Sequence, residues 1–282
     1  MNRRKIEENF FKFLMILATL IVVGSLVLIL GTVVYKGLPS LNLSMIIKTP
    51  SGGFYLGKEG GILNAILGSF SLAGGATILS IIISLPVVLY LNIYARKNSF
   101  LAYFTRFSFD VLGGVPSIVY GAFGLTIMLF LGLNVSLLAG IITVALLELP
   151  LMARAMDEVV RMVPQELKDA SYSLGANKLE TAFKVIVRQT LPALMTAVLI
   201  AFGRGIGDAA SVLFTTGFTD SIPTSLFRPA ATLPLAIFFQ LGSPIPEVQD
   251  RAYAAALILT IVILLISIVT RILKKKFAKH TV

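Results

Sequence analysis

Two charged residues, Arg204 and Asp208, stand inside an apolar stretch where charges are rare. They belong to the run GRGIGDAAS, which begins at Gly203. Residues four apart lie on one face of a helix, so we expect the two side chains to be close enough to pair. A guanidinium at the middle of a bilayer costs about 2.5–3.5 kcal/mol on insertion scales, so Arg204 should face a cavity or a partner. Its planar fork of donors suits a tetrahedral oxyanion.

Two interpretations of this pair are open. In one, Arg204 and Asp208 form a buried salt bridge that only fixes packing. In the other, Arg204 attracts an anion on a translocation path and Asp208 holds it in place. Ser117, in the run GVPS, could donate to the same oxyanion or satisfy a neighbouring carbonyl. A further acid at membrane depth is Glu148, for which Arg154 and Arg188 are the candidate partners.

A charged stretch, 164–192, lies between apolar runs long enough to cross a bilayer. Gly175 permits the left-handed turn that ends one helix and starts the next at an angle. A polar helix–turn–helix between two membrane spans is where a soluble partner can act, although an ordinary helical hairpin is the alternative. The residues that such a partner would contact are Asp169, Ala170, Ser171, Gly175 and Ala176.

This stretch resembles the EAA loop of ABC importer permeases, in which an acidic-Ala-Ala triplet, a glycine and a later Leu-Pro form the coupling helix that docks on the ATPase. Ser171 stands where the family has its second alanine. Val187 and Arg188 stand where most members have a first Leu-Pro pair, so Leu191-Pro192 should start the next span. The resemblance implies a cytoplasmic coupling loop over 157–192.

The elements that must position these residues are membrane spans. Hydrophobic residues make up 56% of the chain and charged residues 13%, which is too apolar for a soluble domain of this length. The sequence therefore predicts an all-α, polytopic membrane protein of six transmembrane helices, with a short cytoplasmic segment, 1–10, ahead of a single membrane domain, 11–282. The predicted spans are about 11–35, 67–95, 111–133, 135–153, 193–215 and 252–273.

The distribution of charge predicts the orientation. Most of the 24 lysines and arginines fall on the side that holds the N-terminus and the 157–192 loop. This positive-inside bias places both termini in the cytoplasm and assigns the net charge of +10 to orientation rather than to nucleic acid. The first span has a long apolar core and reads as a retained anchor. The outer segments, 36–66 and 216–251, are either docking surfaces or simple solvated loops.

A second resemblance is more specific. The run GRGIGDAASVLFTTG resembles a GRAIGETAPLLFT-type segment of the PstA-type permeases of bacterial phosphate importers, with Arg204 at the family's arginine and Asp208 where the family usually has glutamate. GGILNAILGSF, GVPSIVYG and TLPLAIF resemble further segments in the same order. The resemblance implies a type I ABC importer permease of the cell membrane that works with a PstC-like permease, two PstB-like ATPases and a PstS-like phosphate-binding protein.

The sequence contains no GxxxxGK[ST] phosphate-binding loop and no cysteine, and its one histidine is His280. We therefore expect a chain that is not an enzyme, binds no cofactor or metal itself, and relies on a partner to use ATP. Permeases for molybdate, sulfate or phosphonate are alternatives for the substrate. An ion-coupled secondary anion transporter is a further alternative, although the polar 164–192 stretch has no evident role there.

Overall fold

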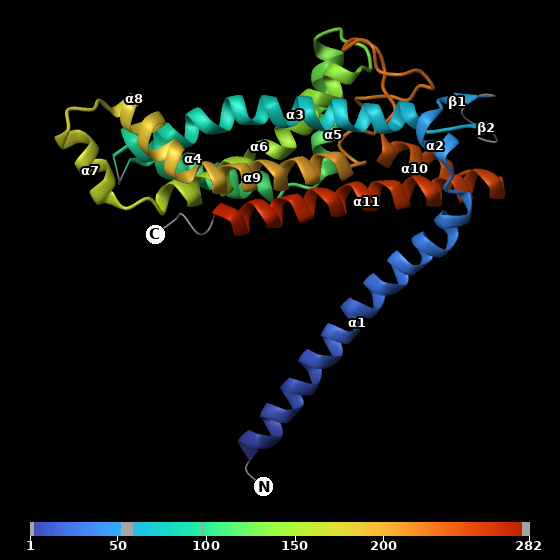
Figure 1. The fold of residues 1–282 in the computed structure, drawn as a ribbon, viewed down its shortest axis with the longest axis horizontal. Helices are drawn as coiled ribbons and strands as arrows, with labels where there is room; N and C mark the ends of the chain where they lie inside the picture. Colours follow the sequence, from blue (N-terminus) through green and yellow to red (C-terminus); the bar gives the residue numbers. More distant parts are fainter. Residues whose placement is uncertain (1–2, 52–58, 97–98, 278–282) are drawn as a thin grey trace.

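The structure is a computed structural model that describes residues 3–51, 59–96 and 99–277, which form a helical bundle (Figure 1). The helices are α1 (Arg3–Ser40), α2 (Leu43–Ile47), α3 (Leu63–Leu89), α4 (Phe100–Gly113), α5 (Ser117–Phe130), α6 (Leu137–Arg161), α7 (Gln165–Ser173), α8 (Lys178–Glu180), α9 (Arg188–Gly207), α10 (Leu233–Leu241) and α11 (Pro246–Phe277). Two π-helical segments, η1 (Tyr90–Tyr94) and η2 (Thr181–Val187), adjoin α3 and α9, and β1 (Pro50–Ser51) pairs antiparallel with β2 (Glu59–Gly60).

The long helices α3, α6, α9 and α11 run side by side (Figure 1). Helices α7 and α8 lie at one end of this bundle, called here the α7 end, and α10 and the β-hairpin lie at the other, the α10 end. The first helix, α1, touches the bundle only near the C-terminal end of the helix, and its N-terminal part extends away from the bundle. At that contact a Cβ on Gly37 would lie 2.6 Å from the carbonyl oxygen of Tyr253 on α11, so the close approach requires glycine.

The prediction of an all-α membrane protein is confirmed. Within the described residues, five helical stretches are long and apolar enough to span a bilayer: Glu7–Ser40, Leu63–Tyr94, Leu137–Arg161, Lys178–Gly207 and Pro246–Leu273. A sixth span arises if the bent pair α4 and α5 is counted as one.

The third predicted span, 111–133, is not one helix. It is broken between α4 and α5, which meet at an angle of 104°. The break falls at Gly114–Pro116, where the proline ring disfavours helical backbone at Val115 and Pro116 itself is extended, with φ −59° and ψ 140°. Gly132, with φ +66°, makes a tight turn after α5.

Other predicted boundaries also differ. α6 does not stop at residue 153 but continues to Arg161, because its last turns bury one face that includes Met156 and Val160. The predicted coupling loop, 157–192, is therefore shorter, since helix α9 starts at Arg188 and continues through Leu191-Pro192. α9 ends at Gly207, and the residues up to 215 that we assigned to the fifth span form turns.

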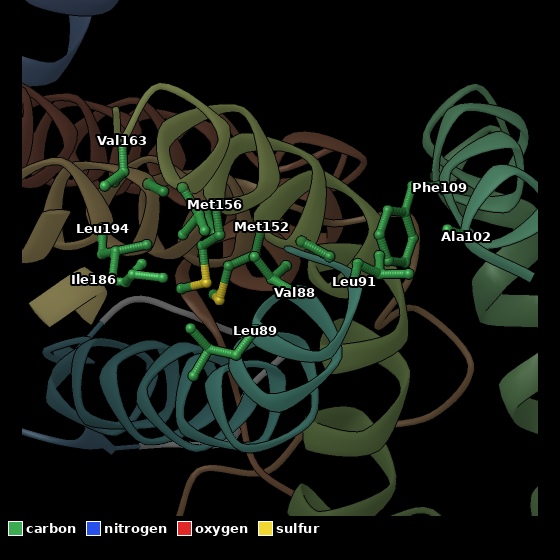
Figure 2. Close-up of a cluster of buried hydrophobic side chains, with 14 residues drawn as sticks. Val88, Leu89, Leu91, Ala102, Phe109, Met152, Met156, Val163, Ile186 and Leu194 are labelled. Carbon is green, nitrogen blue, oxygen red and sulfur yellow. The ribbon is translucent and has the colours of Figure 1, made fainter. Parts of the chain in front are cut away.

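The largest buried apolar cluster lies toward the α7 end (Figure 2). Met152 and Met156 of α6 occupy its middle, with Leu194 on one side and Leu91 and Phe109 on the other. A second cluster joins α3 and α6 to the residues after α9, and a third joins α3 to α10 and α11. The bundle is therefore packed along its whole length, and α6 lies at its centre.

Candidate substrate path and coupling surface

Arg204 lies in the last turn of α9, and its side chain is exposed. Within the described part of the chain it makes no ion pair. A cation in this position is stabilised by the partial negative charge at the C-terminal end of a helix. The guanidinium donors therefore remain available to a ligand or to another subunit.

The expected pairing of Arg204 with Asp208 does not form. Because α9 ends at Gly207, Asp208 is extended, with φ −84° and ψ 122°, and the four-residue spacing no longer puts the two side chains on one helical face. Its Oδ2 instead accepts a hydrogen bond of 2.8 Å from the backbone N–H of Ser211. Asp208 thus shapes the turn that follows α9, and the interpretation of a packing salt bridge is wrong.

Ser117 is the first residue of α5, directly after the break. Its side chain is half-buried, and one turn later the hydroxyl of Tyr120 donates a 2.8 Å hydrogen bond to the carbonyl of Leu112 across the bend. A Cβ on the next residue, Gly121, would lie 2.8 Å from the carbonyl oxygen of Ala210, so the start of α5 lies beside the residues that follow α9. Sequence reasoning missed Tyr120, although it stands in the same GVPSIVYG run.

The arrangement can bind an anion. Arg204 supplies charge-assisted donors, Ser117 supplies a hydroxyl, and the first N–H groups of α5 have no partners within their own helix. The N-terminal end of a helix also carries partial positive charge. Among the described residues no group of three or more acidic, histidine or cysteine side chains could hold a metal ion.

Glu148 is fully buried on α6, and neither Arg154 nor Arg188 is its partner. Its Oε2 accepts a 3.0 Å hydrogen bond from the Thr77 hydroxyl of α3, while Oε1 has no partner in the described structure. That oxygen lies against Gly205, where a Cβ would overlap it. Gly205 therefore allows α9 to pass a buried carboxyl beside Arg204.

The turn after α7 forms as predicted. Gly175 adopts φ +84°, a left-handed conformation that side-chain-bearing residues resist. Its N–H donates to the carbonyl of Tyr172 at 2.9 Å, and the N–H of Ala176 donates to that of Ser171 at 3.2 Å. These two hydrogen bonds define a Schellman motif, which ends α7 and redirects the chain into α8.

The five predicted contact residues are divided by this turn. Asp169, Ala170 and Gly175 are exposed, and Ala176 is half-buried. Ser171 is buried instead, and its hydroxyl lies 2.9 Å from that of Thr181 in η2. The serine therefore holds α7 against η2 rather than facing a partner.

A groove of about 470 Å³ opens beside this motif. It is lined by Leu167, Ala170, Ser171, Leu174, Gly175, Ala176, Glu180, Lys184 and Val185. Leu174 is 89% exposed, an unusual fraction for a leucine in a rigid turn. At the rim, Lys184 and Glu180 form an ion pair of 2.9 Å. This surface, called here the α7 surface, thus offers the exposed Leu174, a groove and a charged rim to a soluble partner.

The two sites lie at different depths of the bundle. α9 begins beside η2 at Arg188 and ends at Gly207, and the rise from Arg188 to Arg204 is about 24 Å. Any effect of the α7 surface on Arg204 must pass through the packed helices. Sequence reasoning also missed a buried charged cluster around Asp157 of α6, which lies between the two sites in the chain.

The comparisons with known proteins agree on one family. Residues 82–281 match the family described as binding-protein-dependent transport system inner membrane component. A Yersinia pestis protein named phosphate transport system permease protein PstA is 35% identical over 254 residues, which cover 89% of this chain and 85% of the relative. A Methanocaldococcus jannaschii protein named probable phosphate transport system permease protein PstA is 31% identical, with coverage of 95% and 94%. A structure of the MetNI methionine ABC transporter in an inward-facing conformation shares the fold, with a TM-score of 0.59 at 19% identity over 76% of this chain and 94% of its own.

Proposed function

The chain belongs to the family of binding-protein-dependent transport system inner membrane components, and on that premise we propose that it is a permease subunit of an ATP-driven inorganic phosphate importer. Family membership rules out the ion-coupled secondary transporter considered from the sequence. The relatives named for phosphate transport support the substrate, since they resemble this chain over most of its length.

The exposed guanidinium of Arg204, beside the start of α5, is the observation that carries the proposal. A permease subunit forms only part of a translocation path, so a charged group with no protein partner in the described chain fits a path completed by a second subunit. Phosphate presents several acceptor oxygens, which a guanidinium binds with two parallel hydrogen bonds. Ser117 adds a further donor near the same place.

The α7 surface fits docking of an ATPase. The Schellman turn presents Leu174 and the groove on a rigid support, and the exposed Asp169 and Ala170 lie on the same helix. We propose that this surface and both termini face the cytoplasm, that the α10 end faces a phosphate-binding protein, and that the chain lies in the inner cell membrane. The proposed partners are a PstC-like permease, two PstB-like ATPases and a PstS-like binding protein, with ATP used by the ATPases.

The mechanism then requires two states of the bundle. Closure of the ATPases displaces α7, and the helices that carry Arg204 and Ser117 change their exposure from one side of the membrane to the other. Each ligand drives this change only by the difference in its affinity for the two states. Arg204 holds the anion during the exchange.

The proposal is tested by uptake of radiolabelled phosphate at micromolar concentration in cells with and without the gene, challenged with unlabelled arsenate, sulfate or molybdate. We expect deletion to remove an arsenate-sensitive component. Surviving phosphate uptake with lost sulfate or molybdate uptake would move the substrate to another oxyanion.

The role of Arg204 is tested by Arg204→Ala with Arg204→Lys as the matched variant. A charge-assisted hydrogen bond contributes about 1.5–3 kcal/mol, so Arg204→Ala should lower uptake at least about tenfold while the complex still assembles. Arg204→Lys keeps the charge but loses the planar fork of donors, so its uptake should lie between that of the wild type and that of Arg204→Ala. Normal uptake by Arg204→Ala would remove Arg204 from the path.

A further inference from the structure

Asp157 is a buried carboxylate on α6 with every oxygen occupied. Its side chain is 0% exposed. Oδ2 accepts a 2.8 Å hydrogen bond from Nε of Arg106 on α4, and Oδ1 accepts a second from Nη2 of the same guanidinium at 3.1 Å. Oδ1 also accepts from Nδ2 of Asn92 in η1 at 2.7 Å. One side chain therefore joins three elements.

The contact with η1 falls where the helix ladder is already altered. Asn92 donates a second hydrogen bond, of 2.8 Å, to the carbonyl of Val88. Single π-helical turns inside α-helices are rare and occur frequently at functional sites. Here the π-helical turn places the amide of Asn92 between its own helix and Asp157, so α3 is tied to α6 at the same point as α4.

The contact of Asp157 with Arg106 and Asn92, called here the joint, has apolar surroundings. Leu91 and Phe109 each lie one turn or less from a member of the joint, and both belong to the buried cluster with Met152 and Met156 (Figure 2). Apolar side chains of similar volume often replace a buried ion pair without loss of stability. Adhesion of these helices therefore does not require charged residues at this point.

A second pair of charges on the same two helices provides a natural control. Nε of Arg154 on α6 lies 3.4 Å from Oδ1 of Asp110 on α4 and 3.2 Å from Oε1 of Glu158. Asp110 is 55% exposed and Glu158 62%. Exposed pairs of this kind are screened by water and ions and hold helices weakly. The buried and exposed pairs thus cross the same interface with different strength.

The position of the joint in the chain gives it a role. α6 continues past Asp157 to Arg161 and leads directly into α7. α4 continues past Arg106 to the break at Gly114–Pro116, after which Ser117 begins α5. Asp157 therefore stands where the helix that carries the α7 surface meets the helix that carries the break.

We propose that Asp157 is a positioning residue that makes α4 move with α6, so that displacement of α7 by an ATPase repositions the α4–α5 break beside Arg204. The inference rests on the proposed function. A bidentate guanidinium–carboxylate contact fixes orientation as well as distance. Apolar faces alone permit small sliding of packed helices. With the joint intact, motion of α6 is transmitted to α4 instead of being lost as sliding.

The test measures ATP hydrolysed per anion imported by the full complex, with its partner permease, ATPase and binding protein, reconstituted in lipid vesicles. Asp157→Asn keeps the shape and removes the charge, and it should raise this ratio at least about tenfold while hydrolysis changes less than about twofold. Arg106→Lys keeps the charge without the fork and should raise the ratio by about threefold. Asp110→Asn, the exposed control, should leave the ratio within about twofold of the wild type.

Two results would overturn the inference. One is a wild-type ratio in Asp157→Asn. The other is a parallel loss of hydrolysis and import in assembled Asp157→Asn and Arg106→Lys complexes, because a purely structural role lowers both together. If Asp157→Asn does not assemble, Arg106→Lys decides alone: a raised ratio supports the inference and a wild-type ratio overturns it.

The outcome is separable from that of the proposed function. Wild-type vesicles that import sulfate or molybdate but not phosphate would refute phosphate as the substrate. The ratio is then measured with the anion that is imported, and the effect of Asp157→Asn on it still supports or overturns the role of the joint.

Discussion

Helix α6 carries two buried carboxyl groups that differ in the hydrogen bonds they accept. Asp157, toward the α7 end, accepts three hydrogen bonds from Arg106 and Asn92. Glu148, two and a half turns away, accepts one from Thr77 and leaves Oε1 without a partner in the described chain. Both side chains are fully buried, so burial alone does not distinguish them.

This difference shows where the contacts of α6 fix a neighbouring helix in one arrangement and where they allow rearrangement. A fully hydrogen-bonded carboxylate restricts its neighbours to one arrangement, because any displacement exposes a charge to an apolar interior. A buried oxygen without a partner costs about 1–3 kcal/mol and gains from any rearrangement that satisfies it. α6 is therefore fixed to α4 near α7 and held less specifically against α9 near Arg204.

The strongest challenge to this comparison is Asp157→Ala. The substitution leaves the guanidinium of Arg106, which is 22% exposed, without its partner, and removal of one member of a buried pair costs about 3–5 kcal/mol. The partial exposure of Arg106 puts the expected loss at the lower end, about 3 kcal/mol. Denaturant unfolding of the detergent-solubilised protein measures it. Asp110→Ala, at the exposed pair, should change the free energy of unfolding by less than about 1 kcal/mol.

A smaller effect is expected for Gly205→Ala, which tests the contact on the other side of α6. The new methyl group overlaps Oε1 of Glu148, and overpacking costs about 1–3 kcal/mol. We expect reduced stability and reduced anion uptake, both recovered in the double variant Gly205→Ala with Glu148→Ala.

Gly203→Ala is the matched control for that contact. A Cβ at residue 203 meets only Ile266, at 3.8 Å, and alanine stabilises a helix interior by about 0.5–1 kcal/mol relative to glycine. A loss of stability in this variant as large as in Gly205→Ala would show that α9 tolerates no methyl group on either face.

Asn92→Ala should cost about 1 kcal/mol in the free energy of unfolding. It removes one hydrogen bond from Oδ1 of Asp157 but leaves the bidentate contact with Arg106. If thermal unfolding instead shows a loss as large as that of Asp157→Ala, the joint depends on the π-helical turn more than on the guanidinium.

The smallest effect is expected for Glu148→Met. Methionine fills a similar volume and removes the oxygen that has no partner, so stability should be unchanged or slightly raised. Unfolding in the same denaturant series measures it. A loss approaching that of Asp157→Ala would mean that both carboxyl groups are structural and would abolish the distinction between the two ends of α6.

The sequence predicted the parts of the molecule that depend on local chemistry. The turn at Gly175 and the apolar spans follow from residue types and their spacing. The break before Ser117 had a signal in Val115-Pro116 that we read as the start of a span. The end of α9 at Gly207 had no sequence signal other than glycines at alternate positions. The expected Arg204–Asp208 pair depended on that helix continuing.

Contacts between distant segments could not be predicted in the same way. Arg106 and Asp157 are separated by 51 residues, and Thr77 and Glu148 by 71. Which charged residues face one another across two helices depends on the rotation of each helix about its axis, and one sequence does not fix this. The partners of Glu148 proposed from sequence were the basic residues Arg154 and Arg188, and the observed partner is a threonine on α3.

Gly37 brings α1 into close contact with α11, so this contact is the point about which a tilt of the first helix is measured. From Gly37 to Glu7 the helix is about 45 Å long, so a tilt of about 10° about this point moves its far end by about 8 Å. Lys36 adds a cation–π contact of 4.8 Å with the ring of Tyr253 at the same place. Two neighbouring residues, Lys36 and Gly37, thus contact Tyr253 at the point from which a change in tilt is multiplied along the helix.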